Sequence, residues 1–361
     1  MQEENGFLID LHCDILINSD ILTVIMNLMT EQLPEHITPH WEKLLQRLTE
    51  QGSTWLQAIQ KQCIPSSEEE HILDIELSDP LGAHRYQVTE RLVHQYKNRV
   101  LLLVNGRCFG YCRHCFRRTY TASQADFLSQ AQLDEVCTYL KSHPEVQEIL
   151  LSGGDPLVAS DEKLTHLMAS IRKASPKILI RLCTRGPIFA PERVTSSLLA
   201  LLKEFRPLWV IPHINHPAEI SMEFSPETRQ ALSKIVDSGI PMQSQTVLLK
   251  GVNDNLTTLS LLFQDLTQLG IRPGYLFQGD LAPGTSHFRV PIEEGVILYE
   301  KLRKELSGLS TPVYAVDLPG GGGKVNLLEL NSDLLSLSVK KEKDRYLFTD
   351  ANGEKWKYPL N

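Results

Sequence analysis

The sequence lacks a long apolar run, an excess of positive charge and a dense framework of cysteines. Its 361 residues carry a formal net charge of −8, which argues against a nucleic-acid partner because phosphate binding needs a basic surface. Asp10, His12 and Asp14 interrupt the apolar N-terminal stretch, so it offers no membrane span of about 20 apolar residues. The same stretch lacks the basic start of a signal peptide, so we expect a cytoplasmic protein. We also expect the residues before Met29 to be dispensable.

Only seven cysteines are present, and three of them gather in one short stretch. Cys108, Cys112 and Cys115 follow the apolar run at residues 100–104, which predicts a buried strand. Three clustered thiols leave one unpaired in a disulfide scheme, and a structural zinc site needs four ligands. Three cysteines can instead bind three corners of a 4Fe–4S cluster and leave the fourth iron open to a small molecule. We therefore predict an iron–sulfur cluster on this loop.

From residue 99 onward, short apolar runs alternate with helical patterns. Six such strand–helix units predict a parallel sheet with right-handed crossovers. Because a full barrel needs eight units, we predict an α/β fold that forms a partial (β/α)6 TIM-like barrel. The expected strands cover residues 100–104, 148–151, 178–183, 208–211, 242–247 and 274–277, and the expected helices cover residues 128–140, 163–173, 194–202, 226–236 and 257–269.

The rest of the chain predicts an addition at each end of this barrel. Helical spacing of Trp and Leu residues predicts an N-terminal helical segment over residues 1–94, with the barrel at residues 95–310. Residues 311–361 form a small C-terminal β element in this interpretation. Its last part, residues 334–361, alternates apolar and polar residues around a turn at Asp350 to Gly353, which predicts a β-hairpin with a structural role.

Polar side chains recur where each predicted barrel strand ends. The carboxyl ends of parallel strands share one face, and α/β barrels place their sites there. The glycines after the second strand have two interpretations, a tight turn or a backbone edge that accepts the amino group of a ligand. The residues at these ends are the three cysteines, Ser152 to Asp155, Thr184 and Arg185, His213 to His216, Gln245, and Gln278 to Asp280.

A glycine-rich loop near the C-terminus forms a second candidate site. Gly320 to Gly323 precede Lys324, and an apolar strand precedes the loop. Because Val325 follows the lysine, the loop does not complete a Walker A motif. The alternatives are a flexible linker and a lysine that forms a Schiff base with pyridoxal phosphate.

Together these motifs resemble those of the lysine 2,3-aminomutase family of radical S-adenosylmethionine enzymes. The resemblance extends over about residues 55–324 and implies a barrel of radical S-adenosylmethionine type. It also implies an isomerase that interconverts L-lysine and β-lysine by 2,3-amino migration. The motifs are Cys-Arg-His-Cys-Phe-Arg-Arg, Leu-Ser-Gly-Gly-Asp-Pro-Leu, His-Ile-Asn-His-Pro, Gly-Val-Asn-Asp and Pro-Gly-Gly-Gly-Gly-Lys.

The resemblance implies three cofactors, which are a 4Fe–4S cluster, S-adenosylmethionine and pyridoxal 5′-phosphate. It further implies an electron from a reductant such as flavodoxin or ferredoxin. The implied cofactor residues are Cys108, Cys112 and Cys115 for the cluster; Ser152, Gly153, Gly154, Asp155, Gln245 and His213 for S-adenosylmethionine; and Lys324, Tyr96 and Arg99 for pyridoxal phosphate.

The resemblance also implies how the substrate is held. Arg117 would bind the carboxylate of L-lysine through two parallel hydrogen bonds. Asp280 and Asp317 would hold the distant ε-ammonium group, although capping or turn roles are an alternative for both. Two carboxylates would repel the side chain of glutamate, so they favour lysine as the substrate.

Two departures from the family pattern leave alternatives open. Gln95 stands where we expect an arginine that helps to neutralise the cofactor phosphate, and no cysteine follows Cys183. The structural zinc site of longer members therefore cannot form, and the formation of a homo-oligomer is left open. One alternative is the lysine aminomutase of the elongation factor P β-lysylation pathway. Another is a non-catalytic iron–sulfur electron-transfer protein, which explains the cysteines but not Lys324, Arg117 or the aspartates.

Overall fold

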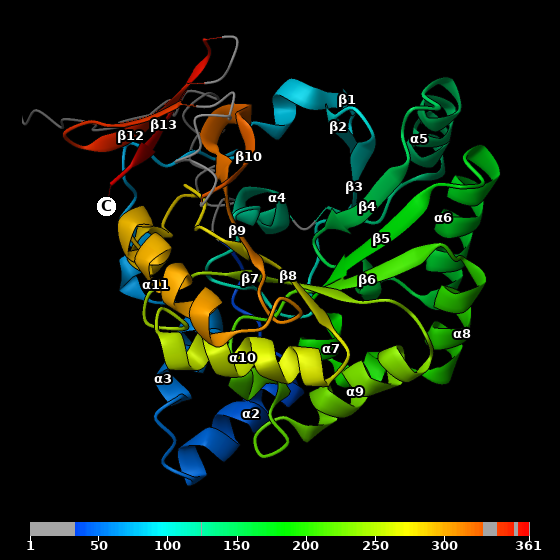
Figure 1. Ribbon diagram of the computed structural model, residues 1–361. Helices are drawn as coiled ribbons and strands as arrows, with labels where there is room; N and C mark the ends of the chain where they lie inside the picture. The colour runs from blue at the N-terminus through cyan, green and yellow to red at the C-terminus, as the bar shows by residue number, and fades with distance from the viewer. Residues whose placement is uncertain (1–32, 124, 328–337, 350–352, 361) are drawn as a thin grey trace, which may run out of the picture.

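The computed structural model describes residues 33–123, 125–327, 338–349 and 353–360. Its centre is a curved sheet whose outer face is covered by helices, as the α/β prediction requires (Figure 1). The expectation about residues before Met29 lies outside the described residues. In the part of the chain that the structure describes, no helix is long and apolar enough to cross a membrane.

The first half of the barrel is a six-stranded sheet in the order β1 to β6. Strands β3 to β6 run parallel to one another, and their buried positions alternate along β3, β4 and β5. The parallel strands are β3 (Arg99–Asn105), β4 (Glu148–Gly153), β5 (Leu179–Thr184) and β6 (Leu208–Pro212).

The second half is a four-stranded sheet in the order β10-β9-β8-β7. Parallel bridges from Val210 to Met242 and from His213 to Gln245 join β6 to β7, so the curvature continues between the two halves. The predicted partial barrel is confirmed, and β9 adds a seventh parallel strand beside β8. The strands of this half are β7 (Gln243–Val247), β8 (Arg272–Phe277), β9 (Val313–Leu318) and β10 (Gly323–Asn326).

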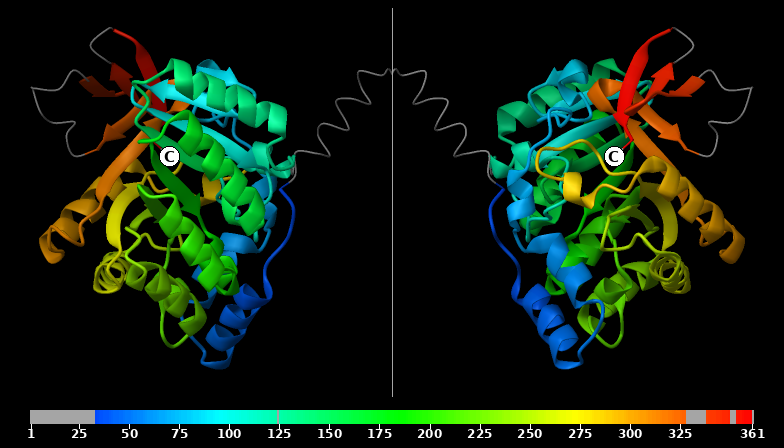
Figure 2. Two further views of the ribbon diagram at one scale, coloured as in Figure 1. Left: turned by 90° about the vertical axis from the view of Figure 1, so that its right-hand side faces the viewer. Right: turned by 90° about the vertical axis from the view of Figure 1, so that its left-hand side faces the viewer.

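The helices between the strands turn apolar faces to the sheet, and four of them, α5, α6, α8 and α10, begin at a side-chain cap. Ser129, Ser160, Thr195 and Asn255 each accept a hydrogen bond from the backbone N–H three residues later. Figure 2 shows these helices covering the outside of the barrel. They are α5 (Gln130–Ser142), α6 (Asp161–Ala174), α8 (Ser196–Glu204), α9 (Pro226–Asp237), α10 (Leu256–Gln268) and α11 (Ile292–Glu305).

The segment before β3 is only partly helical. Helices α2 (Pro39–Glu50) and α3 (Leu56–Cys63) match the prediction. The prediction of a helical segment up to residue 94 is wrong for its end, where β1 (Gln87–Thr89) and β2 (Leu92–Tyr96) are strands. The reason is tertiary, because β2 pairs antiparallel with the edge strand β3 and this pairing overrides local propensity.

The C-terminal element is an antiparallel sheet of three strands, β11 (Ser338–Lys341), β12 (Arg345–Thr349) and β13 (Lys355–Pro359). The predicted hairpin is confirmed by the pairing of β12 with β13, and β11 adds a strand. Short helices complete the fold: α4 (Arg118–Ala122), α7 (Gly186–Phe189), η1 (Ser67–Glu70), η2 (Ala83–Tyr86), η3 (Pro156–Val158), η4 (Pro191–Arg193), η5 (Pro217–Ile220), η6 (Ser286–Phe288) and η7 (Pro319–Gly321).

Candidate active site

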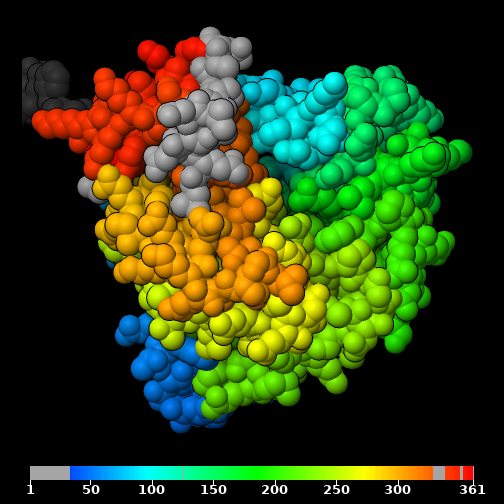
Figure 3. Space-filling model, in the orientation of Figure 1, coloured from blue at the N-terminus to red at the C-terminus, as the bar shows by residue number. Residues whose placement is uncertain are grey.

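A cavity of about 520 Å³ runs along the inner face of the barrel, from Arg99 and Glu148 at the starts of β3 and β4 to the carboxyl ends of the strands. In Figure 3 the cyan surface of β1 and β2 lies beside the orange surface of β9 and β10 on this side of the molecule. The cavity brings together most of the residues that the sequence nominated from motifs more than 200 positions apart. These are Tyr96, Arg99, Cys112, Cys115, Arg117, Ser152, His213, Gln245, Asp280, Asp317 and Lys324.

The double glycine after β4 packs against the start of the cysteine loop. A Cβ atom on Gly154 would overlap the backbone of Arg107, and one on Gly153 would overlap Asn105. The Gly154 N–H donates to the Asn105 carbonyl at 2.5 Å. The structure thus shows these glycines in a close-packing role, outside the cavity wall. A cofactor contact stays a prediction for Ser152, which does line the cavity.

The side chain of Asp155 is turned away from the cavity and is satisfied by protein donors. Its carboxylate accepts hydrogen bonds from the Thr184 hydroxyl at 2.7 Å, the Arg185 N–H at 2.8 Å and the Leu157 N–H at 3.0 Å. Burial raises the pKa of Asp155, and these hydrogen bonds oppose that effect. The Asp155 side chain therefore joins the end of β4 to the end of β5, and a contribution of this residue to S-adenosylmethionine binding stays a prediction.

The three cysteines of the loop are half-buried and lie close enough to affect one another's charge. Burial raises the pKa of Cys108 well above its usual range and that of Cys115 to about 11, and the neighbouring thiols add to both effects. Such a set of thiols is a poor site for three free anions, but metal binding stabilises the thiolate form. The loop therefore fits a positively charged iron centre.

The number of these thiols suits a cluster better than a single structural zinc ion, which needs four ligands. Among residues 33–123, 125–327, 338–349 and 353–360, no three His, Cys, Asp or Glu side chains are grouped around one possible metal position. Ligands of one zinc ion converge on a single point, whereas the cysteines of a cluster each bind a different iron. The chemistry of three soft thiols beside an open cavity thus fits a 4Fe–4S cluster with a free corner.

Lys324 lies opposite Asp317 across the β9–β10 ladder, so the two side chains share one face. Its Nζ lies 2.8 Å from the Asp317 carboxylate and 3.9 Å from the centre of the Phe277 ring. Its backbone N–H donates to the Tyr96 hydroxyl at 2.9 Å, and Arg99 stacks on the Tyr96 ring at 3.9 Å. A lysine held on a strand beside an arginine and a tyrosine fits an aldehyde cofactor that carries a phosphate.

The glycine loop before Lys324 is held by the segment that contains η2. The Gly320 N–H donates to the Pro80 carbonyl at 2.9 Å, and the Tyr86 hydroxyl donates to the Gly321 carbonyl at 2.8 Å. The Gln95 amide also donates to this Gly321 carbonyl, at 3.2 Å. The loop is therefore anchored, so the alternative of a flexible linker is wrong. Gln95 is one of the residues that hold the loop.

Asp280 and Asp317 form an acidic region of the cavity. Burial raises the pKa of Asp280 to about 8, and the charge of Asp317 adds to this effect. Lys324 and Arg117 oppose it, because their positive charges stabilise the Asp280 carboxylate. A cationic group that entered here would have the same effect, so the region suits an ammonium ligand.

Several residues that the sequence did not nominate support this cavity. The Tyr358 hydroxyl of β13 donates to the Gly279 carbonyl at 2.6 Å and accepts from the Gln278 amide at 3.2 Å, directly before Asp280. A Cβ atom on Gly322 would lie 2.7 Å from the indole of Trp356. The C-terminal sheet thus contacts both the lysine loop and the aspartate strand end, and nothing in its local sequence signals this.

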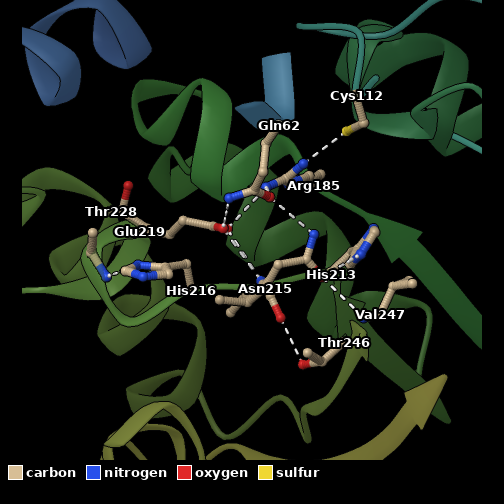
Figure 4. A network of polar contacts seen from close by, with 12 residues as sticks. Gln62, Cys112, Arg185, His213, Asn215, His216, Glu219, Thr228, Thr246 and Val247 are labelled. Carbon is tan, nitrogen blue, oxygen red and sulfur yellow. Dashed lines mark hydrogen bonds and ion pairs between the residues drawn. The ribbon is translucent and has the colours of Figure 1, made fainter. Parts of the chain in front are cut away.

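A buried polar network lies behind the cysteine loop (Figure 4). Within it, His213 contacts Asn215 at 2.9 Å, and burial lowers the pKa of His213 to about 3, so this ring is neutral. Arg185 reaches from the end of β5 to Cys112. Gln62 and Glu219 were not foreseen here, because each comes from a segment distant in the sequence.

Comparisons with known proteins agree with this geometry. The Radical SAM superfamily model matches residues 102–262. A putative L-lysine 2,3-aminomutase of Treponema pallidum is 46% identical over 332 residues, which cover 91% of this chain and 91% of that protein. The chain belongs to the lysine 2,3-aminomutase family. The L-lysine 2,3-aminomutase of Fusobacterium nucleatum is 38% identical over 82% of this chain and 68% of its own length.

Family membership confirms two predictions made from the sequence. The chain is an enzyme of the isomerase class with a radical S-adenosylmethionine fold. The cofactors of this aminomutase family are a 4Fe–4S cluster, S-adenosylmethionine and pyridoxal phosphate. The roles of individual residues toward these cofactors stay predictions.

Proposed function

We propose that this lysine 2,3-aminomutase family member interconverts L-lysine and β-lysine with radical S-adenosylmethionine chemistry and pyridoxal phosphate. The observation that carries the proposal is the single cavity that contains the cysteine loop, Lys324 and the acidic pair of Asp280 and Asp317. An electron-transfer protein would need the cysteines alone. A cavity of this size with both basic and acidic groups suits a small molecule that carries both charges.

The proposed cofactor residues occupy different parts of the cavity wall. Cys108, Cys112 and Cys115 would hold the cluster, and of these Cys112 and Cys115 line the cavity while Cys108 lies outside its wall. Gln245, Ser152 and His213 also line the cavity and would lie beside S-adenosylmethionine. Lys324, Tyr96 and Arg99 would hold pyridoxal phosphate. When bound, the cluster and S-adenosylmethionine supply a hydrogen-abstracting radical, and pyridoxal phosphate supplies the carbonyl that carries the migrating amino group.

The substrate would be oriented by charge in a site with little water. The guanidinium group of Arg117 lies in the cavity wall two residues after Cys115, where a substrate carboxylate would be close to the radical source. Asp280 and Asp317 would hold the ε-ammonium group, which stabilises their ionised forms. A glutamate side chain would instead add a third negative charge to this region, so lysine is the favoured substrate.

The assignment of the aspartates is tested by the kinetics of Asp280→Ala with L-lysine. We expect at least a tenfold rise in KM for lysine, while iron content and pyridoxal phosphate content stay at the wild-type level. Asp265→Ala, which removes a surface ion pair with Arg229, serves as the control. Unchanged lysine kinetics in both Asp280→Ala and Asp317→Ala would refute the proposed substrate contacts.

The setting of the reaction is a further part of the proposal. We propose a cytoplasmic enzyme that receives single electrons from a flavodoxin or a ferredoxin. An enzyme that makes β-lysine for elongation factor P would need the same active site as one that releases free β-lysine. The genomic neighbourhood of the gene would therefore distinguish these two uses of the product. Formation of a homo-oligomer stays a prediction, and sedimentation of the purified protein would test it.

A further inference from the structure

The guanidinium group of Arg185 is placed against a cysteine of the predicted cluster site. Its Nη1 donates to the Cys112 sulfur at 2.8 Å. Its Nη2 donates to the side-chain Oε1 of Gln62 at 2.7 Å and to the Glu219 carboxylate at 3.1 Å (Figure 4). Only 6% of the Arg185 side chain is exposed, so water does not compete for these contacts. One positive charge thus lies between a thiol and a carboxylate.

The partners of Arg185 are themselves fixed by one another. The Gln62 amide donates to Glu219 at 2.9 Å, and the Asn215 amide donates to Gln62 at 3.0 Å. The Asn215 backbone N–H also approaches both Glu219 carboxylate oxygens, at 3.3 and 3.4 Å. All three side chains are fully buried. The side chains of Gln62, Glu219 and Asn215 therefore hold one another in one arrangement, and within the network the Nε–H of Arg185 has no hydrogen-bond partner.

Two further contacts restrict the position of Arg185. Its guanidinium carbon lies 5.4 Å from the centre of the Trp41 ring and 4.9 Å from that of Phe189. The Arg113 N–H in the cysteine loop donates to the Gln62 backbone carbonyl at 2.8 Å, which ties the loop to the end of α3. These contacts restrict the guanidinium group, so its Nη1–H is directed at Cys112.

We infer that Arg185, oriented by Gln62 and Glu219, is a positioning residue that raises the reduction potential of the cluster held by Cys112. The inference rests on the proposed function. Reduction adds one negative charge to the cluster, so a fixed cation and an N–H donor at a ligand sulfur stabilise the reduced form more than the oxidised form. Potentials of iron–sulfur clusters depend on net charge and on hydrogen bonds to their sulfurs.

Glu219 provides the opposite contribution in the same network. Its carboxylate is fully buried and paired with Arg185, so it offsets part of the positive charge that the cluster experiences. Removal of the carboxylate charge should therefore make the cluster easier to reduce, while removal of the guanidinium should make it harder. A role limited to folding would not produce changes of opposite sign.

The test is a potentiometric titration of the anaerobically reconstituted full chain, followed by the electron paramagnetic resonance signal of the reduced cluster. It is done with a chemical reductant and without S-adenosylmethionine or lysine. For Arg185→Met we expect reduction at least tenfold less favourable, which is a shift of about 59 mV to lower potential for one electron. Arg185→Lys should lie between wild type and Arg185→Met, and Glu219→Gln should shift the potential upward.

The control is Arg229→Met, which removes an arginine that joins α9 to Asp265 of α10, and it should leave the potential unchanged. Equal potentials for wild type and Arg185→Met, or shifts of the same sign in Arg185→Met and Glu219→Gln, would overturn the inference. If Arg185→Met does not bind iron, Glu219→Gln decides alone, and an unshifted potential there overturns it. A wild-type protein without a cluster would instead overturn the proposed function.

Discussion

At the residue scale, the acidic pair shows how burial prepares the cavity for a cation. Burial makes ionisation of Asp280 unfavourable, and repulsion by the nearby Asp317 makes it more so. Lys324 forms an ion pair with Asp317, and its positive charge also favours the ionised form of Asp280. Asp280 is therefore mostly protonated near neutral pH, and an ammonium ligand beside it would favour its ionised form.

This arrangement predicts a pH-dependent stability difference between the apo wild type and Asp280→Asn. The folded-state pKa of Asp280, about 8, lies above its ordinary value of 3.8, so folding favours the protonated acid. Its contribution to stability is present at low pH and is lost as the pH rises from about 4 through 8. A pKa difference of one between the folded and unfolded states corresponds to about 1.4 kcal/mol, so even part of the difference is measurable.

We expect Asp280→Asn to melt above wild type at pH 9 and close to wild type at pH 4, in thermal unfolding without cofactors. Asp265→Asn, which changes a partly exposed carboxylate, should show no such trend. A stability difference that does not change with pH would contradict the raised pKa of Asp280.

Residue-level prediction from the sequence succeeded where a local motif carries the chemistry. Cys112 and Lys324 could be predicted because three closely spaced cysteines and a lysine after four glycines are uncommon sequence patterns. Gln62 and Glu219 were not predictable, because 157 positions separate them and their hydrogen bond exists only in the folded chain. The role of Asp155 in joining two strand ends was also not predictable, since its sequence context does not reveal that the neighbouring strand supplies its donors.

At the element scale, the glycine loop depends on the segment around η2. Gly82 has a φ of +59°, and a Cβ atom there would lie 2.5 Å from the carbonyl carbon of Gly320. Gly52 has nearly the same φ, +58°, but nothing lies within 4 Å of its Cβ position. The two glycines therefore separate the cost of the backbone conformation from the cost of the contact with the loop.

We predict that Gly52→Ala lowers the free energy of unfolding by about 1 kcal/mol, which is the cost of a left-handed alanine. Gly82→Ala should cost more and should also lower the retention of pyridoxal phosphate, because Gly320 must move. Unfolding in denaturant and cofactor absorbance after gel filtration measure the two effects. Equal behaviour of the two variants would show that the η2 contact does not support the loop.

The C-terminal sheet supplies a second element-scale prediction through Tyr358. In Tyr358→Phe the hydroxyl contacts with Gly279 and Gln278 are lost, so we expect a severalfold rise in KM for lysine and a stability loss of about 1 kcal/mol. The matched control is Tyr299→Phe, which removes a buried hydroxyl bond to the Pro312 carbonyl. Tyr299→Phe should lower the free energy of unfolding by a similar amount and leave the KM for lysine unchanged. A KM for Tyr358→Phe equal to that of wild type would limit this sheet to a structural role.

The strands of the barrel were predictable because buried parallel strands read as continuous apolar runs between helical patterns. Strands β1 and β2 were not, since β2 is short and gains its partners from the edge of β3. The role of β13 was also missed. Its alternating pattern identifies a strand, but only the folded chain brings Tyr358 to Gly279.

At the scale of the whole molecule, the cavity is assembled from all three predicted parts of the chain. The segment before the barrel holds the glycine loop, the barrel carries the cysteine loop, and the C-terminal element carries Lys324 and supports Asp280. The domain boundaries at residues 94/95 and 310/311 stay predictions. Contacts across both boundaries indicate that the site requires the three parts together.

The central claim is that this assembled cavity performs a 2,3-amino migration on lysine. The most direct measurement is the formation of β-lysine from L-lysine by the anaerobically reconstituted protein with S-adenosylmethionine, pyridoxal phosphate and a reductant. We predict that β-lysine forms only when every component is present, and that Lys324→Ala forms none. Formation of 5′-deoxyadenosine without β-lysine, with all components present, would contradict the claim.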